Sequence, residues 1–255
     1  MEKRSNILIV RLIIVILVCF HLLLSGCVSL PKGMAGMLAG KPSEGVKQLL
    51  DEYGDPDKMT PRDLQWLCHY YGMLKDYNKL YACFDSIQKK IDQGVHEIRY
   101  PELDNQVVGD LNDSLNMGRA TAHLELGRFD EAIVDAQKGI DYLVKYKVPG
   151  GRWSFDGYQY LLGIAYARLN QPDRARIIAK RFGDEADNCK ANPTSCGRDL
   201  QAAQIYSAVG DYQLALDHAN KSEKHIKPAL RDSKFSAFDQ IIMPGISLDN
   251  MQMSH

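Results

Sequence analysis

The sequence predicts an all-α protein, a solenoid of about four helical hairpins that follows an export signal and a short tether. Three observations predict it: an apolar run that ends at a cysteine near the N-terminus, four later segments that repeat one pattern of small residues and aromatics, and intervening stretches rich in Gly, Pro, Asp and Asn. Removal of residues 1–26 would leave 229 residues, enough for one solenoid.

The N-terminal segment has the layout of a secretory signal. Lys3, Arg4 and Arg11 supply positive charge before an apolar run at 12–24. The run leads into Leu-Ser-Gly-Cys at 24–27, which resembles the lipobox of bacterial lipoproteins. The resemblance implies cleavage before Cys27 and lipid on its thiol.

The expected anchor is therefore lipid on Cys27, because two or three acyl chains hold a protein stably at roughly 0.8 kcal/mol per buried CH₂. An uncleaved transmembrane anchor is the alternative, since residues 7–24 could nearly span a bilayer. Val28 follows the cysteine where an Asp would signal inner-membrane retention. The resemblance thus implies the outer membrane, facing the periplasm, if the host has two membranes.

Charge and cysteine content limit the class of partner. The removed segment carries three bases and one acid, so the mature chain has a formal charge of −3, which gives no reason to expect nucleic acid. Cys189 and Cys196 flank a turn-rich stretch, and a disulfide between them would contribute roughly 2 to 3 kcal/mol. Two free thiols are the alternative for that pair. Pairing of Cys68 with Cys83 also stays open.

Four segments share one pattern, in which a helix with a small residue and an aromatic is followed by a short turn and a second helix that opens near an Ala. The clearest copy has Ala203, Tyr206 and Ala215 around the turn at 210–212. Earlier turns are expected at 170–172, 127–129 and 75–77. Small side chains at facing positions allow two helices to approach closely.

At this point the chain resembles the tetratricopeptide repeat (TPR) family over residues 61–228. The copies are offset by 52, 43 and 40 residues, whereas the family's units are about 34 long. Extra segments are therefore expected at about 93–110, 144–154 and 184–196, as loops. The first copy departs most, because Cys68 and Leu80 replace small residues.

The expected domain layout is a signal peptide at 1–26, a lipidated tether at 27–42, the TPR-like domain at 43–244 and a flexible tail at 245–255. A helix is expected at 43–53, and Thr60 should cap another that opens at Pro61. The segment from about Pro228, with Phe235 and Phe238, is expected to pack on the last repeat.

The resemblance implies that the first helix of each unit lines a concave surface, suited to an extended peptide or a helix from another envelope protein. We therefore expect Leu200 and the following partner-binding residues on this surface: His69, Met73, Met117, Thr121, Tyr160, Ile164, Arg168 and Gln204. The expected role is a protein-interaction scaffold that contacts the membrane through its lipid alone.

No catalytic residue, metal site or cofactor is predicted. His69 has no Ser or Cys nucleophile suitably placed, because the adjacent Cys68 points about 100° away on a helix. His218 lacks an evident carboxylate or third ligand in the sequence. The alternative function is an envelope enzyme, or an enzyme-associated subunit, that acts on cell-wall material.

The lipid anchor predicts the behaviour of one substitution. Cys27→Ser should release the protein from the membrane or mislocalise it, because no acyl chain can then be attached, while the helical domain stays folded. Membrane fractionation and circular dichroism measure the two effects. A variant that remains membrane-bound after salt and alkaline washing would favour the uncleaved anchor.

Overall fold

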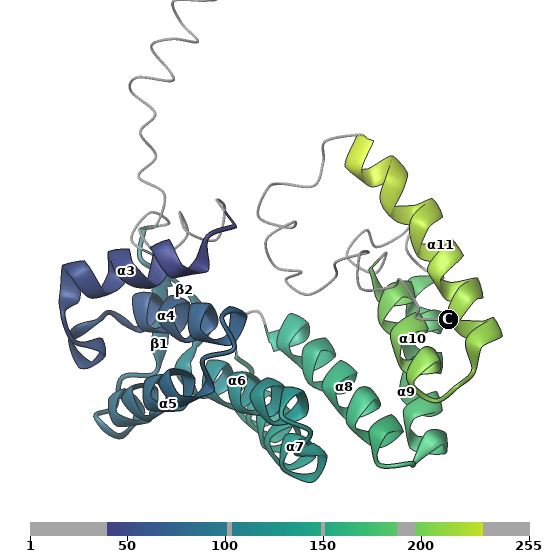
Figure 1. The fold of residues 1–255 in the computed structure, drawn as a ribbon, viewed down its shortest axis with the longest axis horizontal. Coiled ribbons are helices and arrows are strands. Elements are labelled where there is room, and N and C mark those ends of the chain that lie inside the picture. The colour runs from purple at the N-terminus through teal and green to yellow at the C-terminus, as the bar shows by residue number, and fades with distance from the viewer. Residues whose placement is uncertain (1–39, 101–103, 149–150, 188–196, 232–255) are drawn as a thin grey trace, which may run out of the picture.

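A computed structural model describes residues 40–100, 104–148, 151–187 and 197–231. The expected signal peptide, Cys27, Cys189, Cys196 and the segment from 232 onward lie outside the described residues. Within the described ranges the protein is a succession of helical hairpins that runs from α3, on the left of Figure 1, to α11, on the right. Among the helices described, none is both long and apolar enough to cross a bilayer.

Four hairpins form the array, as the sequence predicts. Unit 1 pairs α4 (Pro61–Met73) with α5 (Tyr77–Asp92), and unit 2 pairs α6 (Leu111–Glu125) with α7 (Phe129–Tyr146). Unit 3 pairs α8 (Gly151–Arg168) with α9 (Pro172–Ala186), and unit 4 pairs α10 (Arg198–Ala208) with α11 (Tyr212–Arg231). The all-α solenoid of TPR-like hairpins is thus confirmed.

Every hairpin turns in the same way. A residue with positive φ ends the first helix at the equivalent place in each unit: Lys75, Gly127, Asn170 and Gly210. The next amide bonds back to the helix, as in Asp211 N to Tyr206 O at 2.9 Å and Arg128 N to His123 O at 2.8 Å. Such a helix end is closed by a residue in the left-handed backbone conformation, which Gly and Asn adopt most readily.

One repeat position ties the two helices of every unit together. Its occupants are Cys83, Asp135, Ile178 and His218. Cys83 forms a disulfide with Cys68, with a Cα–Cα distance of 5.6 Å, which settles the pairing that the sequence leaves open. Asp135 lies 3.1 Å from His123, and His218 Nδ1 lies 2.8 Å from the buried Asp199.

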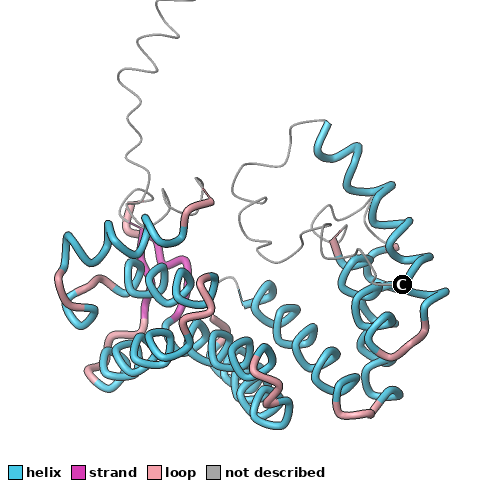
Figure 2. The backbone as a smooth tube through the Cα atoms, viewed as in Figure 1, coloured by secondary structure: helices cyan, strands magenta, loops and turns pink. Residues whose placement is uncertain are grey.

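The segment at 93–110 is not a loop, so that expectation is wrong. It forms an antiparallel hairpin of β1 (Glu97–Tyr100) and β2 (Gln106–Asp110), the two strands of the described residues (Figure 2). Ile98 is buried in the core of unit 1, while Glu97 and Arg99 on either side of it are exposed. This alternation stabilises the hairpin against α4.

The ends of the array differ. Helix α3 (Pro42–Tyr53) covers the outer side of α4, and a Cβ at Gly45 would lie 2.4 Å from the Tyr70 ring. After the short 3₁₀ turn η1 (Pro56–Lys58), Thr60 caps α4 by accepting from Asp63 N, as expected. At the other end α11 continues through Pro228 to Arg231, beyond the end expected for it.

The disulfide of unit 1 gives a stability prediction. Cys83→Ala should lower the free energy of unfolding by about 3 kcal/mol, because the crosslink closes a loop of about 15 residues. Thermal melts with and without reductant measure it: reductant should lower the melting temperature of the wild type and leave that of the variant unchanged. Equal sensitivity of both proteins to reductant would contradict the prediction.

Candidate functional site: the groove between α4 and α6

The first helices of units 1 and 2 enclose a groove of about 740 Å³, which we call the α4–α6 groove. Four of the predicted binding residues line it together: His69 and Met73 from α4, and Met117 and Thr121 from α6. Helix α5 supplies the floor through Leu80, Phe84 and Ile87, which are buried.

Helical periodicity places these residues on one surface. His69 and Met73 are one turn apart on α4, as are Met117 and Thr121 on α6. The turn before each pair also reaches the groove, through Gln65 on α4 and through Asp113 and Ser114 on α6, which the sequence analysis missed. Extending the same i, i+4 spacing backwards would have found Gln65 and Asp113, and the i, i+3 spacing would have found Ser114.

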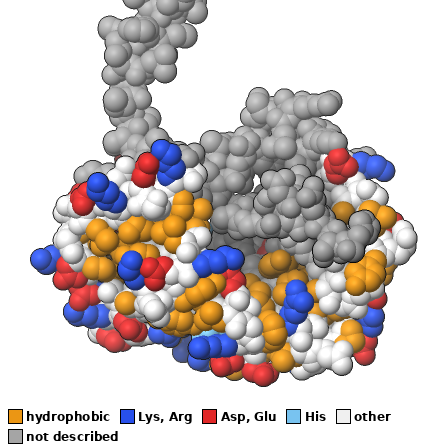
Figure 3. All heavy atoms as spheres, viewed as in Figure 1, with side chains coloured by type: hydrophobic (Ala, Val, Ile, Leu, Met, Phe, Trp, Pro, Cys, Tyr) orange, Lys and Arg blue, Asp and Glu red, His pale blue; other side chains and the backbone are white. Residues whose placement is uncertain are grey.

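The wall of the groove at Met73 is apolar and partly exposed. Met73 is 43% exposed, although it lies on a wall that also contains the buried Cys68. Methionine side chains are unbranched and adapt to irregular apolar surfaces, which suits a wall that receives side chains from another molecule. Figure 3 shows apolar side chains gathered over unit 1 and around α8, with charged side chains mostly towards the edge of this face.

His69 lines the groove and also contains a buried polar atom. Its Nε2 is buried and has no hydrogen-bond partner in the part of the chain that the structure describes. Burial lowers the pKa of the imidazole, so the ring is held neutral at physiological pH. A neutral imidazole has one donor and one acceptor nitrogen, and a buried ring nitrogen without a partner lowers the stability of the folded state.

The opposite wall is anchored by a buried carboxyl. Asp113 accepts hydrogen bonds from Tyr158 at 2.9 Å and from Ser154 at 2.5 Å, both on α8. Burial raises its pKa, against the lowering effect of these two bonds. Burial and the neighbouring Asp113 likewise raise the pKa of the Tyr158 hydroxyl. The contact joins unit 3 to the groove-lining helix of unit 2.

The remaining predicted residues do not reach this groove. Tyr160 and Ile164 on α8 are half-buried against the core of units 2 to 4, and burial raises the pKa of Tyr160. Arg168 at the end of α8 is exposed, and Gln204 on α10 is half-buried. Leu200, also expected on the concave surface, is instead buried in unit 4.

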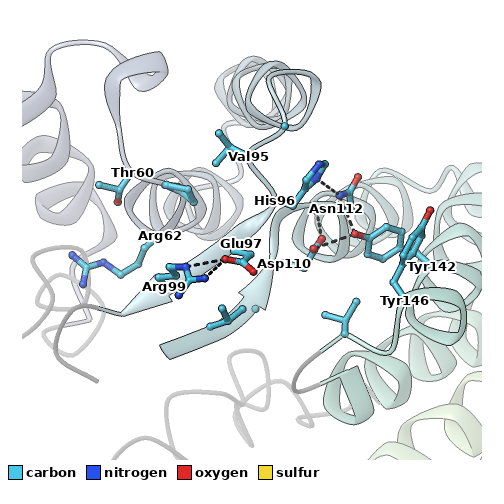
Figure 4. A pocket seen from close by; sticks show the side chains of 15 residues that line it. Thr60, Arg62, Val95, His96, Glu97, Arg99, Asp110, Asn112, Tyr142 and Tyr146 are labelled. Atoms are coloured by element: carbon cyan, nitrogen blue, oxygen red, sulfur yellow. Dashed lines mark hydrogen bonds and ion pairs between the residues drawn. The ribbon is translucent and has the colours of Figure 1, made fainter. Parts of the chain in front are cut away.

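A second hollow of about 1120 Å³, the hairpin pocket, lies between the β-hairpin and the end of α7 (Figure 4). Its polar side chains form hydrogen bonds with one another. Asn112 Nδ2 lies 3.1 Å from His96 Nδ1 and 3.2 Å from the Tyr142 hydroxyl. This hydroxyl donates to Asp110 Oδ2 at 3.1 Å. Burial and Asp110 raise the pKa of Tyr142 to about 12.

Other charged groups near the hairpin pocket are also paired within the protein. Asp110 already accepts from the first amides of α6, at 2.7 Å for Asn112 N, so these amides are not presented to an anionic ligand. Glu97 and Arg99 form an ion pair with each other. Among the described residues, no group of His, Cys, Asp and Glu has the arrangement of a metal site.

Comparisons with known proteins agree with the fold and add no family. No family model and no curated protein matches the sequence. Two crystal structures from Podosopora anserina, described as a kinesin light chain with nearly identical TPR-like repeats, align with TM-scores of 0.54 and 0.52. Both are 14% identical and cover 78% of this chain and 93% of their own.

Structures of the protein MamA also align, for example over 78% of this chain and 96% of that chain at 13% identity, but a TM-score of 0.42 is too low to support an argument. The kinesin light chain structures support the TPR-like architecture. At this identity the likeness concerns the fold alone.

The buried carboxyl predicts a pH effect on stability. Because the folded state holds the Asp113 proton more tightly than the unfolded chain, wild-type stability should fall as the pH rises above about 3.8, until the carboxyl ionises in the folded state too. Because an Asn side chain does not ionise, Asp113→Asn should not lose stability in this way. The free energy of unfolding of the variant, relative to that of the wild type, should therefore increase with pH over that window. Denaturant titrations at stepped pH measure it, and a difference of the opposite sign would show that Asp113 is stabilised as the anion.

Proposed function

We propose that this protein is a lipid-anchored interaction protein of the bacterial cell envelope, and that its α4–α6 groove binds an apolar segment of a partner protein. The observation that carries the proposal is the convergence of His69, Met73, Met117 and Thr121 on one open groove. Hydrophobic grooves between helices typically accept an amphipathic helix or an extended peptide.

The groove favours an apolar segment. Its side chains would contact Met73 and Met117 and the floor made by Phe84 and Ile87. The charged groups at the edge of the groove, Lys75 and Glu125, have opposite signs, and the carboxyl of Asp113 already accepts hydrogen bonds from Tyr158 and Ser154.

Two independent features support a location outside the cytoplasm. The Cys68–Cys83 disulfide belongs in an oxidising compartment, since cytosolic thiols are kept reduced. The N-terminal sequence that ends at Cys27 predicts export and lipid attachment. A lipid on Cys27 would keep the domain close to a membrane, because the 14 residues from Val28 to Lys41 extend at most about 50 Å.

Partner capture tests the groove directly. The mature, lipidated protein should recover a specific protein from detergent-solubilised envelope after crosslinking, and Met73→Glu should reduce recovery at least about tenfold, because a carboxylate would be placed in an apolar contact. Val134→Glu is the matched control, since Val134 is 52% exposed on α7 and does not line the groove.

The control should recover as much partner as the wild type. Recovery of no specific protein by the wild type, or equal recovery by the two variants, would contradict the proposal. Circular dichroism of each variant establishes that the helical domain is folded, which separates loss of binding from loss of structure.

A further inference from the structure

The last helix of the array presents an uncovered apolar stripe. Tyr212, Leu216 and Ala219 lie at i, i+4 and i+7 on α11, and therefore on one face. Tyr212 is 64% exposed and Leu216 is 55% exposed. Figure 1 shows α11 at the end of the array, and among the described residues no helix follows it.

The same three repeat positions carry the contact between units 1 and 2. In α5 they are Tyr77, Tyr81 and Phe84. All three meet α6: the Tyr77 hydroxyl donates to Glu125 at 2.8 Å, the Tyr81 and His123 rings are 6.0 Å apart, and a Cβ at Gly118 would lie 2.7 Å from the Phe84 ring. In unit 1 this stripe is covered by the antiparallel helix that comes next in the chain.

The central position is also engaged in units 2 and 3. Ile133 packs against the core of units 2 to 4. Arg176 reaches Asp211 in the turn of unit 4, through two hydrogen bonds of 2.7 and 2.9 Å. Leu216 occupies the equivalent position in unit 4, so an apolar side chain stands where units 1 and 3 contact the unit after them.

The start of the array has no such uncovered face. Helix α3 lies outside the repeats and packs on α4, with Leu49 fully buried and Gly45 against Tyr70. An additional helix thus closes one end of the solenoid. At the other end, 24 residues of chain continue beyond Arg231.

We propose that residues 232–255 of the same chain dock on the stripe formed by Tyr212, Leu216 and Ala219. The segment contains Phe235, Phe238, Ile241 and Ile242, whose spacing puts their side chains on one face of a helix. It can reach the whole stripe: Tyr212 lies 19 residues, about 28 Å, from the end of α11, and 24 residues span about 36 Å even when fully helical.

The docked segment is an intramolecular ligand that completes the array and keeps α11 from pairing with another molecule. The segment would dock at the end of the solenoid away from the α4–α6 groove. Its docking does not depend on the proposed function of that groove. Partner capture by the groove and docking of the segment can therefore succeed or fail separately.

Hydrogen exchange of the full mature protein, followed by mass spectrometry, tests the docking. Amides at 235–243 should exchange at least about tenfold more slowly than in a synthetic peptide of the same sequence. Leu216→Asp should abolish this protection, and Phe238→Ser should abolish it from the other side of the contact. Ile177→Asp is the control, because Ile177 is 72% exposed on α9 and lies off the stripe.

We expect the segment to be protected in the wild type and in Ile177→Asp, and unprotected in Leu216→Asp and Phe238→Ser. Exchange of the wild-type segment at the rate of the free peptide would overturn the proposal. Sedimentation velocity tests whether a second copy of the chain covers the stripe instead. In that case the wild type would be a dimer, Leu216→Asp would be a monomer, and the segment would be unprotected in both.

Discussion

The two helices of each hairpin are held at close range by one side chain of the second helix, and the rest of the array depends on that contact. The contact differs between the four units. In unit 1 Cys83 forms a disulfide with Cys68, whereas in units 2 and 4 a histidine and an aspartate pair, Asp135 with His123 and His218 with Asp199. In unit 3 Ile178 packs near Gly163, where an added Cβ would lie 3.4 Å from the Ile178 methyl group. Unit 1 has Leu80 where the other units have Ala, so a covalent bond holds the helices that a small residue would otherwise let approach.

Closure within the hairpins determines how they stack. With its two helices fixed, each unit presents a stripe on the second helix to the first helix of the next unit, and Phe84 fits only because Gly118 has no side chain. The first helices then lie side by side, and the space between α4 and α6 remains as a groove because α5 fills its floor. The groove is therefore a product of helix pairing in units 1 and 2 rather than of a separate binding element.

Sequence alone could predict the parts of this arrangement that depend on local chemistry. Gly127, Asn170 and Gly210 favour the left-handed backbone of the turns, and the i, i+4 spacing places His69 with Met73 and Met117 with Thr121. It could not predict contacts between distant residues, such as Asp199 with His218, because their meeting depends on helix packing. The β-hairpin was missed because its strands are short and lie among Gly, Pro, Asp and Asn, although Ile98 and Tyr100 do alternate with charged residues.

The disulfide connects the proposed location of the protein with its proposed binding site. Cys68 lies in the wall of the α4–α6 groove, and its bond to Cys83 fixes α4 relative to the groove floor on α5. Under reducing conditions unit 1 would have to rely on apolar packing around Leu80, without the small residue that lets helices approach elsewhere in the array. A groove built in this way favours an oxidising compartment, which is where the sequence that ends at Cys27 would send the protein. An exported protein would meet the oxidising conditions that the Cys68–Cys83 bond requires, and the unit that contains this bond is the repeat nearest Cys27 in the sequence.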